Sequence, residues 1–147
     1  MPTEIRTRPA ARTAEFGLLY AQVQQFYAHQ LQLADAQDGE RWAQTFTEDA
    51  VLVAPLPGRP VRGRSRLAAR ASGPAGRDTA GAGTRRWIGM LEVHPQPDGT
   101  LSTRCSALAY RAGRLHVCAM QDVLVRSGNT WRIRHRLLTR DDDHTCP

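Results

Sequence analysis

The chain of 147 residues contains no lysine, because all twenty of its basic residues are arginine. Without a lysine amine, the protein cannot form the Schiff bases on which pyridoxal and related covalent chemistry depend. Long apolar runs are also missing, and the N-terminus is polar, with no hydrophobic segment behind it. Because a membrane span needs about 20 apolar residues, we expect a cytoplasmic protein without a membrane partner.

Cysteine is scarce, and the three cysteines, Cys105, Cys118 and Cys146, are widely spaced. An odd number at such spacing fits neither a disulfide framework nor a zinc site, so we expect reduced thiols. The five histidines form no HxH or HExxH pattern, and no cofactor-binding motif is present. The sequence therefore predicts an activity that uses neither a metal nor a cofactor.

The composition, with 41% hydrophobic residues, is enough for the core of one ordinary domain. We expect this domain at residues 15–141, between a flexible N-terminal arm (1–14) and a flexible tail (142–147). The net charge of +6 raises the alternative of nucleic-acid binding. However, the arginines are scattered and not interleaved with aromatic residues, which favours a solvated basic surface and no nucleic-acid partner.

Two helices are expected near the N-terminus. Apolar residues recur at three- and four-residue spacing from Glu15 to about Asp35, which predicts a long amphipathic helix. Asp38 is a good N-cap for a second, shorter helix that carries Trp42 and Phe46 on one face. A third short helix is expected at Arg64 to Arg70.

The remainder predicts strands. A short strand spans Ala50 to Val53, and four longer runs separated by turn signals follow later in the chain: Arg85 to His94, Leu101 to Arg111, Leu115 to Arg126 and Trp131 to Arg140. Helices followed by an antiparallel meander predict an α+β fold in which the helices cover one face of a curved sheet and enclose a ligand pocket. The Gly- and Ala-rich segment 72–83 is expected to be a mobile loop, either a lid or simple disorder.

The last strand contains a candidate catalytic histidine. Its alternation predicts that Trp131, Ile133, His135 and Leu137 face the helices and that Arg132, Arg134 and Arg136 face away. Among apolar neighbours, His135 would stay neutral and could transfer a proton. A core histidine held by one hydrogen bond is the alternative.

Two carboxylates are further candidates. Asp122 lies in a largely apolar strand, where a carboxylate is either paired, with an arginine for example, or functionally perturbed. Asp35 closes the first helix at its apolar face and could act as a general base at the mouth of a cavity, although Asp35 or Asp38 could instead cap the helix junction. The expected walls of the pocket are Tyr20, Tyr27, Trp42, Trp87, Met90 and Met120.

The stretch Leu33, Ala34, Asp35, followed by Asp38, Trp42, Phe46 and Asp49, resembles the "LDxxD...FxxDA" opening of the nuclear transport factor 2-like superfamily, in its SnoaL-like and scytalone dehydratase-like branch. The runs RRWIGML (85–91) and DVLVRSGNTWRIRHRLLTRD (122–141) are similar to the later strands of that superfamily. The resemblance covers most of residues 20–141. It implies a cone-shaped fold and a homodimer formed through the sheet face.

The resemblance also implies roles for individual residues. Asp35 matches a catalytic aspartate of the dehydratase branch, whereas Arg86 stands where that branch has a catalytic histidine, which argues against the same dehydration mechanism. Asp122 is the nearest match to the acid/base aspartate of the polyketide cyclases. Similar sequences also include the β subunits of ring-hydroxylating dioxygenases, which have no catalytic centre of their own.

These observations predict a small tailoring enzyme of bacterial secondary metabolism, a cyclase, dehydratase or isomerase that acts on a hydrophobic, polyketide-like substrate. Asp35, Asp122 and His135 would provide general acid/base catalysis, and Arg86 would stabilise developing negative charge. The alternative is a non-catalytic accessory or ligand-binding subunit, similar to a dioxygenase β subunit.

Overall fold

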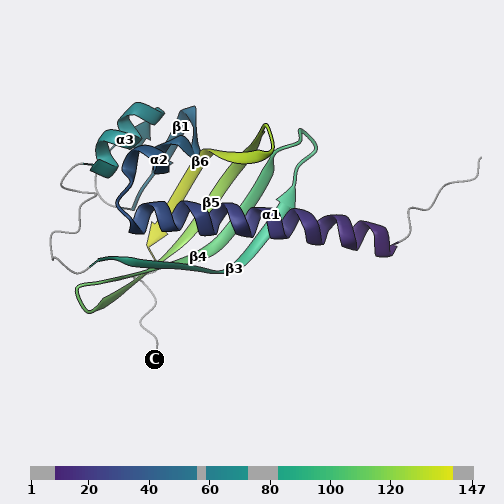
Figure 1. Ribbon diagram of the computed structural model, residues 1–147, viewed down its shortest axis with the longest axis horizontal. Helices are drawn as coiled ribbons and strands as arrows, with labels where there is room; N and C mark the ends of the chain where they lie inside the picture. Colours follow the sequence, from purple (N-terminus) through teal and green to yellow (C-terminus); the bar gives the residue numbers. More distant parts are fainter. Residues whose placement is uncertain (1–8, 56–58, 73–82, 141–147) are drawn as a thin grey trace, which may run out of the picture.

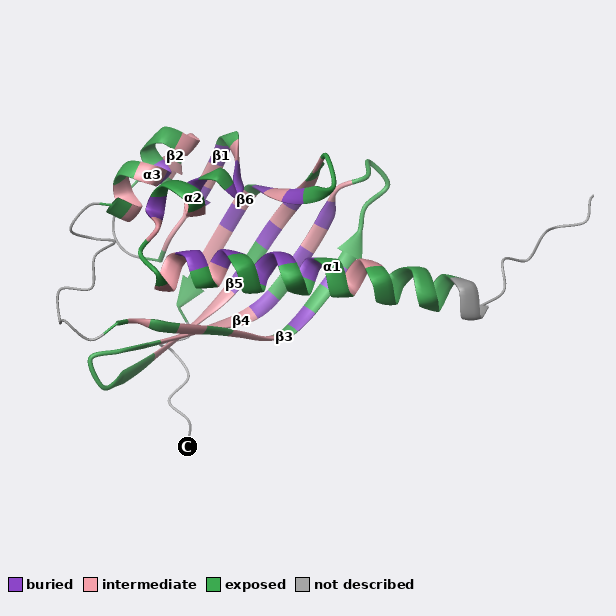
Figure 2. Cartoon of the chain, in the orientation of Figure 1, coloured by how far each residue is buried: buried purple, intermediate pink, exposed green. Residues whose placement is uncertain are grey.

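The computed structural model describes residues 9–55, 59–72 and 83–140. The expected tail and most of the expected loop and N-terminal arm lie outside these residues. Helix α1 spans Pro9–Asp35, so it begins earlier than the predicted start at Glu15. At 1.5 Å per residue its 27 residues are about 40 Å long. The helix crosses one face of the sheet and its N-terminal part extends beyond it (Figure 1), and residues 12–18 are exposed (Figure 2).

Two short helices pack against each other at the end of α1. Helix α2 spans Gly39–Gln44, and the side chain of its N-cap Asp38 accepts a hydrogen bond from the backbone N–H of Arg41. Helix α3 spans Arg64–Ser72. Both lie on the same side of the sheet as α1 (Figure 1), which confirms the predicted layer of helices.

The sheet has six strands in the order β2-β1-β6-β5-β4-β3. The strands are β1 (Phe46–Val53), β2 (Val61–Arg62), β3 (Arg85–Pro95), β4 (Leu101–Arg111), β5 (Arg114–Ser127) and β6 (Thr130–Arg140). Strands β3 to β6 form the predicted antiparallel meander, whereas β1 pairs in parallel with β6. The two-residue strand β2 has too short an apolar pattern to be predicted. Phe46 begins β1 rather than extending α2.

Two β-bulges change which side chains face the helices. In β6, Val123 pairs with His135 but Leu124 pairs with Ile133, so Arg134 is an extra residue. Because side chains alternate between the two faces of a strand, one extra residue places each later side chain on the face opposite to the one that simple alternation predicts. Arg136 therefore faces the core and is buried, whereas His135 lies on the outer face. The predicted orientations of His135, Leu137 and Arg136 are wrong for this reason.

A second bulge lies in β3 between Gly89 and Glu92, where Met90 adopts a positive φ of 53°. The inward residues are Arg86 and Ile88 before the bulge and Leu91 and Val93 after it. Met90 points to solvent and is 87% exposed. The prediction that it lines a pocket is therefore wrong.

The core lies between α1 and the inner face of the sheet. Its largest fully buried apolar side chains are Tyr27, Phe46, Leu67, Leu124, Ile133 and Val23.

None of the helices in the described ranges combines the length and the apolar character that crossing a bilayer requires.

Candidate functional site

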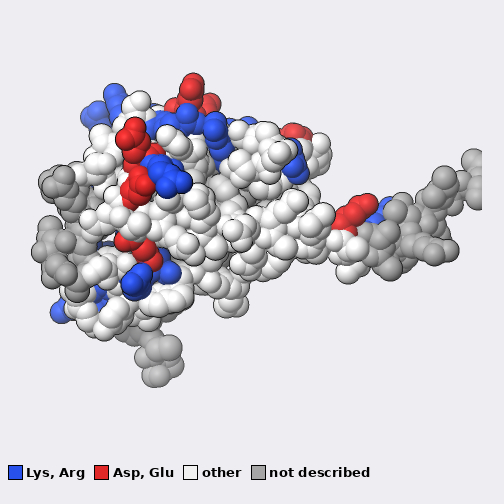
Figure 3. Space-filling view, viewed as in Figure 1, with Lys and Arg blue, Asp and Glu red and all other residues white. Residues whose placement is uncertain are grey.

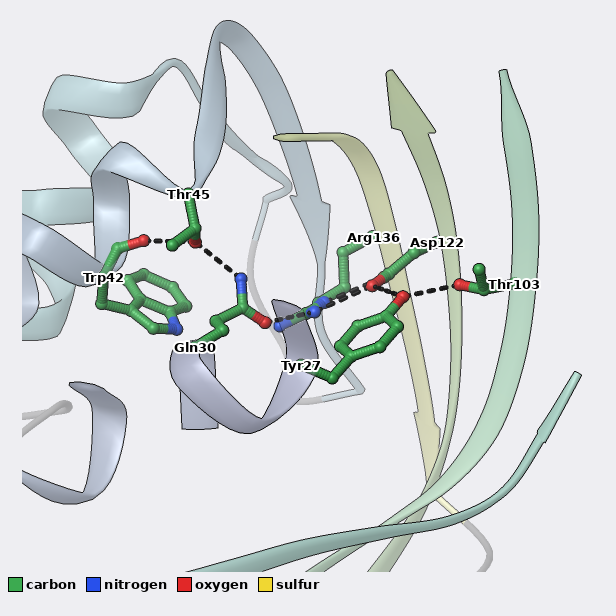
Figure 4. A network of polar contacts seen from close by, with 7 residues as sticks. All are labelled: Tyr27, Gln30, Trp42, Thr45, Thr103, Asp122 and Arg136. Carbon is green, nitrogen blue, oxygen red and sulfur yellow. Dashed lines mark hydrogen bonds and ion pairs between the residues drawn. The ribbon is translucent and has the colours of Figure 1, made fainter. Parts of the chain in front are cut away.

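Asp122 on β5 is the centre of a buried polar network (Figure 4). Its Oδ1 accepts a hydrogen bond from Nε of Arg136 at 2.9 Å, and its Oδ2 accepts one from Nη2 at 2.8 Å. The hydroxyl of Tyr27 on α1 also donates to Oδ2, at 2.8 Å. Since Tyr27 has a single hydroxyl proton, Thr103 must donate to the Tyr27 oxygen across their 2.6 Å contact. The strand register explains the grouping, because Thr103, Asp122 and Arg136 are direct neighbours on β4, β5 and β6.

The network continues from Arg136 toward α2. Nη2 of Arg136 donates to Oε1 of Gln30 at 2.7 Å, and Nε2 of Gln30 donates to Oγ1 of Thr45 at 2.7 Å. Thr45 in turn donates to the carbonyl of Trp42. In the part of the chain that the structure describes, no buried side-chain nitrogen or oxygen lacks a partner. The network therefore joins α1, the C-terminal end of α2 and three strands.

The electrostatics of this network favour a fixed ion pair. Burial alone would lower the pKa of the Arg136 guanidinium, but the Asp122 carboxylate offsets this and raises it. Burial, and then the negative charge of Asp122, raises the pKa of Tyr27 well above its usual value. Tyr27 is thus a neutral hydrogen-bond donor at physiological pH, and Arg136 is always charged. Asp122 and Tyr27, predicted as catalytic and pocket residues, are both part of this network.

A second ion pair lies where α1 ends beside β3. Asp35 Oδ1 accepts a hydrogen bond from Nη1 of Arg86 at 2.8 Å, and Oδ2 accepts one from the backbone N–H of Arg86 at 3.3 Å. Both side chains are partly exposed, by 14% for Asp35 and 32% for Arg86. Asp35 therefore binds Arg86 at two points and fixes where its guanidinium lies. The structure brings together these two predicted site residues and keeps them apart from Asp122, which does not line the cavities beside Arg86.

Arg86 lines two apolar cavities that meet at its side chain and at Leu31. The first, the helix cavity, has a volume of about 190 Å³ and lies between the end of α1, α2, α3 and β1, where Trp42 and Leu52 form part of its wall. The second, the sheet cavity, has a volume of about 170 Å³ and lies over β4 and β5. Its lining residues are Leu31, Arg86, Trp87, Ala107, Leu108, Ala109, His116, Cys118, Met120 and Leu138. Asp35 lines a third hollow, of about 280 Å³, whose wall also includes Arg86 and Leu31.

His116 also lines the sheet cavity, and the sequence did not predict it there. In the strand register Arg86 pairs with Ala109, and Ala109 pairs with His116, so the three residues share the inner face. Strands are about 4.8 Å apart, which places the backbones of Arg86 and His116 about 10 Å from each other. The sequence signal was alternation in β5, where His116, Cys118, Met120 and Asp122 are spaced by two, but the inner set could not be identified because both sets are largely apolar.

The other predicted pocket residues lie in several places. Trp42 and Met120 line the helix cavity and the sheet cavity, respectively. Trp87 borders the sheet cavity but leaves 51% of its surface exposed. Tyr20 packs against the core, and its hydroxyl donates to the carbonyl of Leu91. His135, on the outer face, lines neither cavity.

This arrangement provides one cation and one imidazole at an apolar cavity. A guanidinium held by a carboxylate can stabilise a developing oxyanion, because its position requires no reorganisation during the reaction. An imidazole can donate or accept a proton near neutral pH. The described residues contain no group of three or more histidine, cysteine, aspartate or glutamate side chains that could hold a metal ion.

Comparisons with known proteins agree with this architecture. A comparison with curated proteins found no match. Among solved structures, Aln2 from a Streptomyces species is 35% identical, with 84% of this chain and 91% of Aln2 covered and a TM-score of 0.73. ActVI-ORFA from Streptomyces coelicolor is 28% identical, with 84% and 98% covered and the same TM-score of 0.73.

The fold is also that of a nuclear transport factor 2-like protein with a cystatin-like fold from Novosphingobium aromaticivorans. That protein is 23% identical, with 95% of this chain and 94% of that chain covered and a TM-score of 0.76. These similarities confirm the predicted cone-shaped α+β fold. The SnoaL-like domain family matches residues 18–137, which is most of the chain, and the protein therefore belongs to that family.

Proposed function

We propose that the protein is a cofactor-independent tailoring enzyme of the lyase or isomerase type, a cyclase, dehydratase or isomerase that acts on a polyketide-like substrate. One observation carries this proposal. Arg86, held by Asp35, lines an apolar cavity whose wall also includes His116. Family membership supports the substrate class, since the SnoaL-like branch that the chain resembles includes polyketide cyclases.

In this mechanism Arg86 binds a carbonyl or phenol oxygen of the substrate. When a C–H proton beside a carbonyl is removed, negative charge develops on that oxygen, and the guanidinium stabilises the enolate. His116 takes the proton as a general base and returns it to the product carbon or to the leaving oxygen. A positioned acid/base group contributes on the order of 100- to 10,000-fold to the rate.

Asp35 has a positioning role in this proposal. Both of its oxygens bind Arg86, through the guanidinium and through the backbone N–H. Asp122 and His135 take no part in proton transfer here, because Asp122 is enclosed by its partners and His135 lies on the outer face. The proposal therefore keeps Asp35 and Arg86 from the sequence-based hypothesis and replaces His135 with His116.

The test is turnover of a panel of aromatic polyketide ketones by the purified protein and four variants. Arg86→Gln and His116→Gln should each lower kcat/KM by on the order of 100-fold or more. The matched controls are Arg85→Gln, an exposed neighbour of Arg86, and His135→Gln on the outer face. Equal loss in His135→Gln and His116→Gln would contradict the proposed site, and no turnover of any substrate would favour an accessory or ligand-binding subunit.

We also propose a cytoplasmic homodimer formed through the outer face of the sheet. Trp87, Leu108 and Val117 are direct neighbours across β3, β4 and β5, and Tyr110 and Leu115 on the same face are about half exposed. A monomer rarely exposes so many large apolar side chains together. Light scattering after gel filtration should give twice the mass of the chain, and Trp87→Arg should give a monomer.

A further inference from the structure

The inner end of the sheet cavity is closed by a row of three neighbouring side chains. Cys105 pairs with Met120, and Met120 pairs with Leu138, so the row crosses β4, β5 and β6 on the inner face. Met120 and Leu138 line the cavity, and only 3% of Met120 is exposed. The next row inward is Thr103, Asp122 and Arg136, the centre of the buried polar network. One layer of side chains therefore separates the cavity from that network.

The cavity runs along β5 from His116 to Met120. These residues are four positions apart, which corresponds to about 13 Å of strand at 3.3 Å per residue. Arg86 and His116 form one end, where a substrate oxygen would bind, and Met120 forms the other. The volume of about 170 Å³ is close to that of an apolar cavity of about 150 Å³ known to hold a single benzene ring.

We propose that Met120 determines substrate specificity by setting how far a ring can extend from Arg86 into the sheet cavity. The proposal rests on the proposed function, in which Arg86 binds a substrate oxygen. With methionine at this position, one six-membered ring fits between the bound oxygen and the closing row. Substrates whose second ring continues in the same direction are excluded, whereas rings that extend toward the helix cavity are accepted.

Met120 is the decisive member of the row for two reasons. It lies on the middle strand, between Cys105 and Leu138, so its side chain meets the end of the cavity directly. It is also long, unbranched and conformationally adaptable, so a shorter side chain there lengthens the cavity without moving the backbone. With a shorter side chain at position 120, the cavity would reach the edge of the buried polar network around Asp122.

The test compares the binding of two probes by ligand-detected NMR. Phenol has one ring, and 4-phenylphenol adds a second ring on the side opposite the hydroxyl, which points toward Met120 when the hydroxyl binds Arg86. The measured quantity is the Kd for phenol divided by the Kd for 4-phenylphenol. The variants are Met120→Ala, which deepens the cavity, and Met120→Phe, which fills it. The matched control is Met90→Ala, a methionine that is 87% exposed.

Met120→Ala should raise this ratio by about tenfold or more, because a hydrophobic pocket typically discriminates a size mismatch by about 10- to 200-fold. Met90→Ala should keep the wild-type ratio, and Met120→Phe should weaken phenol binding itself. An unchanged ratio in Met120→Ala together with unchanged phenol binding in Met120→Phe would overturn the proposal. Met120→Phe removes no core atoms, so the test stands even where Met120→Ala folds poorly.

The two proposals fail in different ways. The probe ratio requires no turnover. A shifted ratio in a protein that converts no ketone would therefore support the proposal that Met120 limits ring size and contradict the proposal that the protein is an enzyme. Arg86→Gln should weaken the binding of both probes equally, since both carry the same hydroxyl. If Arg86→Gln leaves both affinities unchanged, the hydroxyl does not bind Arg86. The probes then do not extend from Arg86 toward Met120, and the proposed role of Met120 is wrong.

Discussion

Asp122 and Arg136 are direct neighbours on β5 and β6 and form two hydrogen bonds of 2.8 and 2.9 Å within the core. The side chain of Asp122 is fully buried, and that of Arg136 is 6% exposed. A buried pair of this kind stabilises little relative to apolar residues of the same shape, but removing one partner leaves a buried charge without compensation. The pair therefore fixes how α1 and the sheet pack, through the links to Tyr27 and Gln30.

Asp122→Leu and Arg136→Met should each lower the free energy of unfolding by about 3–5 kcal/mol. The double variant Asp122→Leu/Arg136→Met should lose less than the sum of the two, because no unpaired charge remains. Urea denaturation followed by circular dichroism measures these values. Glu92→Ala is the control, since Glu92 belongs to an exposed pair with His94 and should cost only about 0–1 kcal/mol. Additive losses in the double variant would show that the two side chains act independently.

Alkaline pH should destabilise the protein through Cys105 and Tyr27. Burial raises the pKa of the Cys105 thiol from 9.0 to about 11, and burial also raises the pKa of Tyr27. As pH rises above 9.0, the unfolded chain loses the Cys105 proton while the folded protein still holds it. The free energy of unfolding must then fall with increasing pH until the folded thiol also ionises near pH 11.

The contribution of Cys105 is therefore complete below pH 9.0 and is lost by about pH 11. The urea concentration at the midpoint of unfolding should fall less steeply with increasing pH in Cys105→Ala than in the wild type. Identical slopes in wild type and Cys105→Ala would be inconsistent with the raised pKa.

The same burial predicts which thiol reacts first. The thiolate is the nucleophile, and Cys105 is buried with a raised pKa, so it should react slowly with a disulfide reagent. Cys118 lines the sheet cavity and is more accessible. In a Cys146→Ser background, mass spectrometry of tryptic peptides should find Cys118 labelled before Cys105. Saturating phenol should slow the labelling of Cys118, whereas faster labelling of Cys105 would refute the predicted order.

Two glycines should respond in opposite ways to alanine. A Cβ on Gly39 would lie 2.9 Å from Cβ of Ala71 and 3.2 Å from its backbone carbon, so α2 and α3 must move apart. Gly39→Ala should therefore lower the free energy of unfolding by about 1–3 kcal/mol. Gly17, in the exposed part of α1, has nothing within 4 Å of such a Cβ.

Gly17→Ala should raise the free energy of unfolding by about 0.5–1 kcal/mol, because alanine is the better helix former. Thermal melting of both variants measures the difference. Gly39→Ala should also change the helix cavity, since Gly39 and Ala71 both line it. A Gly39→Ala variant as stable as the wild type would show that the two helices separate at no cost.

Charged side chains gather over the end of the molecule that carries α2, α3 and the end of α1, whereas the middle of the same face is largely uncharged (Figure 3). The ion pair of Asp35 and Arg86 lies toward this end, between α1 and β3. Composition alone gave only the net charge of +6. The position of Arg86 at the meeting of two apolar cavities depends on how the chain folds.

The sequence by itself determined the order of the elements. Apolar spacing predicted α1, Asp38 marked the start of α2, and turn residues separated the four strands of the meander, because these signals are local along the chain. The resemblance then specified the family and selected Asp35 and Arg86, which the structure places in contact.

Only the tertiary structure decided which side chains share the pocket. The bulge at Arg134 turned Arg136 into the core and His135 outward, and the bulge at Met90 turned that side chain to solvent. A bulge is one extra residue in a strand pairing, and simple alternation along one strand cannot reveal it. The partner of Asp122 and the place of His116 beside Arg86 followed from the register between strands, which a single sequence does not specify.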